Sequence, residues 1–162
     1  MNNFKKEFDK TGFCIIKKNF EIQFIEKIIE EVNNAKRVDK YFDKNGKIRR
    51  IEKLYNKGEN LKILNNKILS TLKNIFGKDF TIFKDKFNAK PPGGEGFYAH
   101  YDGIFKFKNL QNIVKNGWYE YTNFFINVLI ALDPSNNKNG TIEVANAEVN
   151  DFEILYKKTK KN

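Results

Sequence analysis

The chain contains a single histidine, His100, and an aspartate, Asp102, follows it two positions later. Side chains two residues apart on a strand point to the same face, with their α-carbons about 6.6 Å apart. An imidazole nitrogen and a carboxylate oxygen from such a pair can bind one metal ion, at about 2.1 Å each. With a second histidine from elsewhere, the pair forms the ligand set of non-haem Fe(II) oxygenases. The pattern alone is common, and a lone histidine more often has a structural role, so the surrounding sequence must decide between the two.

Two amphipathic helices are predicted before this segment. The first spans 21–35, and the second spans 61–76 and ends at Gly77, because glycine is common just past the end of a helix. In both, apolar residues recur every three to four positions, which indicates one face turned toward a core. These residues are Ile25, Ile28, Ile29 and Val32 in the first helix and Leu61, Leu64, Ile68, Leu72 and Ile75 in the second.

Strands are predicted in most of the remainder. A short strand is expected in 8–20 after the Thr11-Gly12 pair, and Asn45-Gly46 predicts a tight turn. Further strands are expected in 79–90, in 96–102 and, after the turn at 134–140, in 141–146. The apolar run 124–133 reads as a central strand, buried on both faces except near Asn127, and 103–123 reads as a long aromatic-rich connection.

Helices followed by antiparallel strands indicate an α+β or jelly-roll architecture rather than alternating strands and helices. The chain of 162 residues has no repeat and no composition shift that would mark a boundary. We therefore expect a single domain over 1–162, with a lead-in of helices and strands in 1–78 and a β-rich part in 79–162.

The net charge of +10 raises the question of nucleic-acid binding. The chain has only three arginines, Arg37, Arg49 and Arg50, and its lysines are scattered, whereas phosphate recognition favours the bidentate fork of arginine.

The N-terminus lacks the apolar stretch of a signal peptide, and no apolar run approaches the roughly 20 residues needed to cross a membrane. With one cysteine, Cys14, we expect a soluble cytoplasmic protein with a buried, reduced thiol.

Three segments resemble the phytanoyl-CoA dioxygenase family of Fe(II)/2-oxoglutarate-dependent oxygenases. "FDKTGFCIIKKNF" (8–20) resembles the opening of that family, and "DKFNAKPPGGEGFYAHYDG" (85–103) resembles its strand, glycine-rich loop and metal-binding strand. "NVLIALDPSNNKNGTIEVAN" (127–146) is similar to its following strand, asparagine-glycine turn and return strand. The three segments occur in the order of the family, and together the resemblance covers essentially the whole chain.

The resemblance implies a double-stranded β-helix, incomplete at its C-terminus, with helices packed outside it. It implies that His100 and Asp102 are the first two iron ligands and that Asn88 contacts the cosubstrate 2-oxoglutarate. The cofactors would be Fe(II) and 2-oxoglutarate, with ascorbate as an optional reductant, and the reaction would be hydroxylation of a small organic substrate. Tyr98 and Trp118 are the candidates for contact with that substrate, whose identity the sequence does not reveal, and nor does it reveal the oligomeric state.

The chain departs from the family downstream of the asparagine-glycine turn. It has no second histidine and no arginine after Arg50, although the family uses both to complete the iron and cosubstrate sites. We therefore expect an N-terminal portion of such an oxygenase, with weak Fe(II) binding and no turnover by these residues alone. Two alternatives remain open, namely a non-catalytic β-helix module that binds a small molecule or a partner and, less favoured, a lysine-rich nucleic-acid binder.

Overall fold

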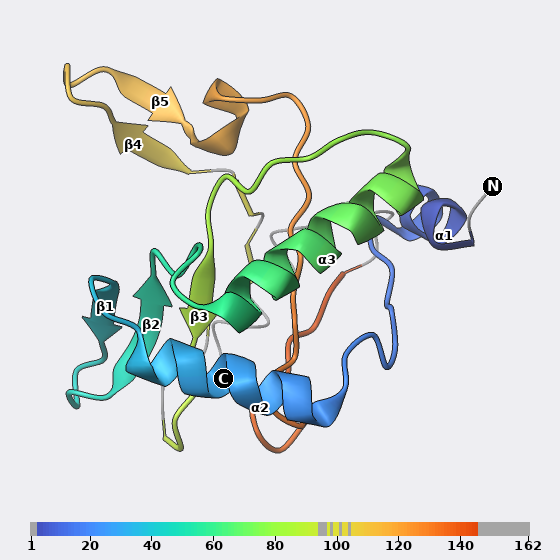
Figure 1. The fold of residues 1–162 in the computed structure, drawn as a ribbon. Coiled ribbons are helices and arrows are strands. Elements are labelled where there is room, and N and C mark those ends of the chain that lie inside the picture. The colour runs from blue at the N-terminus through green and yellow to red at the C-terminus, as the bar shows by residue number, and fades with distance from the viewer. Residues whose placement is uncertain (1–2, 94–96, 98, 101, 104, 146–162) are drawn as a thin grey trace. The chain divides into compact units, whose positions relative to one another are not determined.

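The structure is a computed structural model that describes residues 3–93, 97, 99–100, 102–103 and 105–145. Figure 1 shows its helices and strands along the chain. These residues divide into two compact units. Residues 3–93 and 131–145 belong to the first unit, and the described residues between 97 and 130 belong to the second.

Both predicted helices are confirmed in the first unit. Helix α2 (Ile22–Asn34) packs against helix α3 (Glu59–Phe76), as Figure 1 shows. Helix α3 ends at Gly77, which has a φ of 68° and donates its N–H to the carbonyl of Lys73 at 2.8 Å. This left-handed residue is the helix end that the sequence predicts. Among its described residues, the buried apolar ones are Ile28, Val32, Ile51, Leu54, Leu61, Leu64 and Ile75.

The N-terminal segment differs from its prediction. Residues 8–11 belong to helix α1 (Asn3–Thr11), and residues 12–20 form no strand. The helix ends at Gly12, which has a φ of 84° and donates its N–H to the carbonyl of Phe8 at 2.8 Å. The ring of Phe8 packs edge-on against Phe76 of α3, with centroids 5.1 Å apart. The Thr-Gly pair therefore ends a helix that is held by packing, instead of opening a strand. Cys14 is a free thiol and is half-buried.

A three-stranded antiparallel sheet lies beside these helices in the order β1-β2-β3 (Figure 1). It consists of β1 (Asp39–Phe42), β2 (Ile48–Glu52) and β3 (Lys86–Asn88). The predicted turn at Asn45-Gly46 joins β1 to β2 and is confirmed. Asp43 closes this turn, because its Oδ1 accepts the N–H groups of Asn45 and Lys47 at 2.8 and 2.9 Å. Of the strand predicted in 79–90, only β3 is present.

The second unit contains a hairpin that was predicted as an irregular connection. Strands β4 (Lys106–Lys108) and β5 (Val114–Asn116) pair antiparallel and lead into a 3-10 helix, η1 (Gly117–Glu120). Asn109 forms the turn, since its side-chain oxygen accepts the N–H groups of Gln111 and Ile113 at 3.0 and 2.9 Å. An asparagine whose side chain bonds the backbone two residues on is a turn signal, and it is the feature of the sequence that indicates this hairpin.

Residues 124–133 do not form the predicted central strand. Phe124, Val128 and Leu129 are exposed over 45%, 45% and 64% of their surface. A strand needs a neighbour for its backbone hydrogen bonds, and among the described residues no strand pairs with this segment. Residues 141–145 likewise form no strand.

The described residues combine helices with antiparallel sheets of three and two strands and contain no barrel. The jelly roll stays a prediction. Within the same residues, no helix is both long enough and apolar enough to cross a lipid bilayer.

Candidate functional site

The side chains of His100 and Asp102 approach each other, as their spacing predicts. Nε2 of His100 lies 3.5 Å from Oδ1 of Asp102, and the two side chains are 59% and 49% exposed. The backbone around them is not a strand at the positions described, because Ala99 is a bend and Asp102 and Gly103 lie in a turn. A turn therefore brings the pair together where a flat strand was expected.

Gly103 fixes this turn against the rest of the second unit. Its carbonyl accepts the N–H of Trp118 at 2.9 Å. With a φ of 83°, it adopts a conformation that favours glycine, and an added Cβ would lie 2.5 Å from Cζ of Phe125. A Cβ on Gly117, which has a φ of 64°, would lie 1.8 Å from the carbonyl oxygen of Gly103. Two glycines thus let η1 and an aromatic ring close on the turn that carries Asp102.

The second oxygen of the Asp102 carboxylate has its own partner. Oδ2 accepts a hydrogen bond from Nδ2 of Asn127 at 2.9 Å. In the sequence, Asn127 is only a polar break in the apolar run 124–133. A lone polar residue in such a run was the available signal for this contact.

The separation of the His100 and Asp102 donors fits shared binding of a cation. Two donors about 2.1 Å from one ion, at about 90–110° to each other, lie about 3.0–3.4 Å apart, and the observed separation is 3.5 Å. Within the ranges that the structure describes, no group of three or more His, Cys, Asp or Glu side chains is placed to hold an ion. The fit therefore extends to two ligands.

The other candidate residues lie in different places. Asn88 is exposed at the end of β3 in the first unit, whereas His100 belongs to the second unit, so its cosubstrate role stays a prediction. Trp118 is half-buried in η1 and packs edge-on against Phe105, with centroids 4.9 Å apart. Tyr98 lies outside the described residues.

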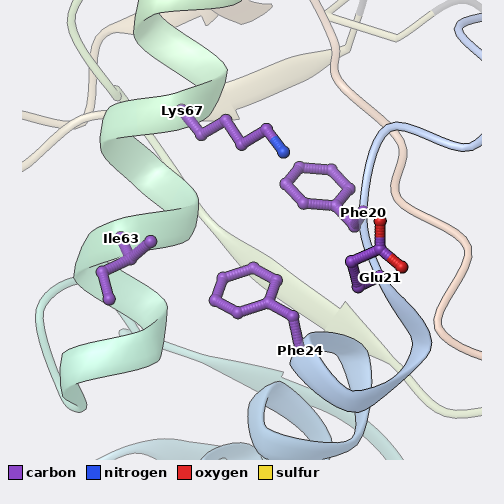
Figure 2. Close-up of a pocket in the computed structure, with 5 residues that line it drawn as sticks. All are labelled: Phe20, Glu21, Phe24, Ile63 and Lys67. Atoms are coloured by element: carbon purple, nitrogen blue, oxygen red, sulfur yellow. The ribbon is translucent and has the colours of Figure 1, made fainter.

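A separate hollow of about 160 Å³ lies in the first unit, between the start of α2 and the side of α3. Figure 2 shows Phe20 and Phe24 turned toward Ile63 and Lys67, with Glu21 at the edge. Nζ of Lys67 lies 4.6 Å from the centre of the Phe20 ring and donates to the carbonyl of Asn19 at 2.6 Å. The lysine therefore serves local packing, and the hollow contains no histidine or second carboxylate for chemistry.

A charged cluster joins β2 to the segment before β3. Oε1 of the buried Glu52 lies 3.1 Å from Nε of Arg50 and 3.1 Å from Nζ of Lys84. Burial raises the pKa of the neighbouring Asp85, and the Glu52 carboxylate adds to the rise, whereas a hydrogen bond from the backbone of Leu54 opposes it. The Glu52 carboxylate is thus paired with two cations, one from β2 and one from the segment before β3.

Comparisons of the chain with protein-family models, with curated proteins and with solved structures gave no match. The chemistry open to the chain is therefore inferred from the geometry of His100, Asp102 and Asn127 and from the motifs of its own sequence.

Proposed function

We propose that the chain supplies two iron ligands, His100 and Asp102, to an Fe(II)/2-oxoglutarate-dependent oxygenase that hydroxylates a small organic substrate. The observation that carries the proposal is the 3.5 Å approach of Nε2 to Oδ1, close to the separation of two donors on one ion. Both side chains are about half exposed, so an ion and a cosubstrate have access to them. The resemblance of three segments to phytanoyl-CoA dioxygenases supports the choice of iron and 2-oxoglutarate.

The residues of the chain would bind and orient, and bound iron would supply the redox chemistry with dioxygen. Asp102 would offer a carboxylate oxygen to the ion, and His100 would offer an imidazole nitrogen. In the same proposal, Tyr98 and Trp118 contact the substrate. A site with two protein ligands binds weakly, because each ligand adds stabilisation and orients the others.

The test is an anaerobic titration with Fe(II), in which calorimetry measures the binding. We expect weak binding by the chain and loss of that binding in His100→Ala and in Asp102→Ala. Asp133→Ala, which removes another exposed aspartate, is the matched control and should bind like the wild type. Unchanged binding in His100→Ala would mean that iron binds elsewhere, and the proposal would be wrong.

The same variants should be assayed for succinate with Fe(II), ascorbate, 2-oxoglutarate and oxygen. We expect no turnover by residues 1–162 alone, because the chain has one histidine. Succinate formed by this chain and abolished by His100→Ala would show that other groups complete the site.

A non-catalytic binding module is the second candidate. It is favoured by the lack of a third metal-binding side chain near the pair among the described residues. It predicts no Fe(II) binding that depends on His100, so the same titration separates the two functions.

A further inference from the structure

The two oxygens of the Asp102 carboxylate are used differently. Oδ1 faces Nε2 of His100 at 3.5 Å, while Oδ2 accepts from Nδ2 of Asn127 at 2.9 Å. A hydrogen bond to one oxygen restricts the rotation of the carboxylate about its last bond. The oxygen left for a cation is then the one beside His100.

The segment that carries Asn127 is attached to the Asp102 turn at a second point. Phe125 lies two residues before Asn127, and its ring is so close to Gly103 that a Cβ there would be 2.5 Å from Cζ. The same ring packs edge-on against Tyr119 of η1, with centroids 5.2 Å apart. The ring contact beside Asp102 and the amide contact on Asp102 together fix the register of 125–127 against this turn.

An uncharged donor suits this role. A lysine or arginine on Oδ2 would neutralise much of the carboxylate charge that a cation needs, whereas an amide orients the carboxylate and leaves that charge in place. Ligating carboxylates in metal sites are themselves commonly hydrogen-bonded, and loss of such a partner costs about 10–100-fold in metal affinity.

We infer that Asn127 is a positioning residue, which holds the Asp102 carboxylate so that Oδ1 is presented beside His100. The orientation itself is independent of any metal. Its consequence for metal affinity rests on the proposed function.

Two variants at Asn127 and one control isolate the amide. Asn127→Leu keeps a similar volume without a donor. Asn127→Gln keeps the donor on a longer side chain, and Asn123→Leu is a control at an exposed asparagine of the same segment. Because Asn127 is exposed, the unfolding temperature should change little in any of these variants, so lost affinity would not report unfolding.

The orientation is tested by NMR on the metal-free protein. The side-chain amide signals of Asn127 are identified as the pair that disappears in Asn127→Leu. Asp102→Ala should shift this pair, and Asn123→Leu should leave it in place. A pair that does not respond to Asp102→Ala would overturn the inference, whether or not the protein binds a metal.

The consequence is tested with Mn(II), whose free form is counted by its EPR signal. We expect Asn127→Leu to weaken binding about tenfold and Asn127→Gln to retain more affinity than Asn127→Leu. Equal affinity of wild type and Asn127→Leu, with binding lost in His100→Ala, would overturn the inference and leave the proposed function standing. Absence of binding by the wild type would refute the proposed function, and the NMR result would then decide the inference.

Discussion

Glu31 of helix α2 caps the N-terminus of helix α3, and this contact predicts how the first unit is stabilised. Its Oε1 accepts the backbone N–H and the side-chain Nδ2 of Asn60 at 2.9 and 2.7 Å, and its Oε2 accepts the N–H of Leu61 at 2.9 Å. The first N–H groups of a helix have no partner within the helix, and the helix dipole favours an anion there. The residue at the N-cap position is Gly58, which has no side chain that could accept a hydrogen bond from these N–H groups. A carboxylate from a neighbouring helix takes its place.

The energy of this cap can be worked out from its hydrogen bonds. Loss of a capping side chain costs about 0.5–2 kcal/mol, and hydrogen bonds to charged groups are worth about 1.5–3 kcal/mol. Because Glu31 is only half-buried, we take the lower part of the range for hydrogen bonds to charged groups. Glu31→Ala should lower the free energy of unfolding by about 2 kcal/mol, and Glu31→Gln by about 1 kcal/mol, since an amide oxygen still accepts. Urea unfolding followed by circular dichroism measures both, with the exposed Glu30→Ala as control.

The pH dependence has a defined sign. Burial raises the pKa of Glu31, but the hydrogen bonds from Asn60 and Leu61 outweigh it and hold the pKa below its ordinary value of 4.5. A carboxyl with a lowered pKa in the folded state stabilises the fold above its unfolded pKa and loses this effect as pH falls through the folded pKa. The difference between wild type and Glu31→Gln should therefore be full at neutral pH and shrink below pH 4.5.

A double-mutant cycle with Gly58 gives the sharpest test. A Cβ at Gly58 would lie 2.1 Å from Oε2 of Glu31, while its φ of −153° suits any residue. Gly58→Ala should therefore destabilise the wild type by about 1 kcal/mol through displacement of the cap. It should cost clearly less in the Glu31→Ala background, because no cap is left there to displace. Additive effects within about 0.5 kcal/mol would refute the reasoning, because residues that share one interaction do not behave independently.

Two other contacts lead to predictions of their own. Gly117→Ala should disrupt the second unit, because the added Cβ would lie 1.8 Å from the carbonyl oxygen of Gly103. The fluorescence of Trp118, the only tryptophan, should then shift to the red, and an unchanged spectrum would contradict the close approach. Asp85→Asn should raise the urea midpoint at neutral pH, because burial raises the pKa of Asp85 and so makes its ionised form unfavourable in the fold. That gain should vanish below the ordinary pKa of 3.8, where the unfolded state is protonated too, and a gain that persists there would exclude this cause.

Helices α2 and α3 could be predicted from the sequence because local and tertiary preferences agree in them. Apolar residues at helical spacing, such as Ile28 and Val32, are the same residues that the fold buries. The turn at Asn45-Gly46 could be predicted because its chemistry lies within five residues. Helix α1 could not, since its stability depends on the contact of Phe8 with Phe76, far away in the sequence.

Strands were harder to predict because a strand is defined by its partner. The run 124–133 has the composition of a buried strand, yet no described strand lies beside it and Leu129 is 64% exposed. By contrast, β4 and β5 are short and mostly exposed, and they form because Asn109 closes a turn between them. Composition indicates whether a segment has apolar side chains to bury, but it does not indicate which backbone groups will form hydrogen bonds with that segment.

In the candidate site, too, the local contact could be predicted and the long-range contact could not. The pairing of His100 with Asp102 could be predicted from a spacing of two, which keeps two side chains close in a strand and also in this turn. The third member, Asn127, lies 25 residues beyond Asp102 and reaches it because Phe125 fixes the segment against Gly103. No local pattern encodes that register. It depends on Gly103, which has a φ of 83° and leaves room for the ring of Phe125. The position of that ring places the Asn127 amide within reach of the Asp102 carboxylate. A larger residue at Gly103 would therefore disturb Asp102 twice, through the turn that carries it and through the asparagine that orients it.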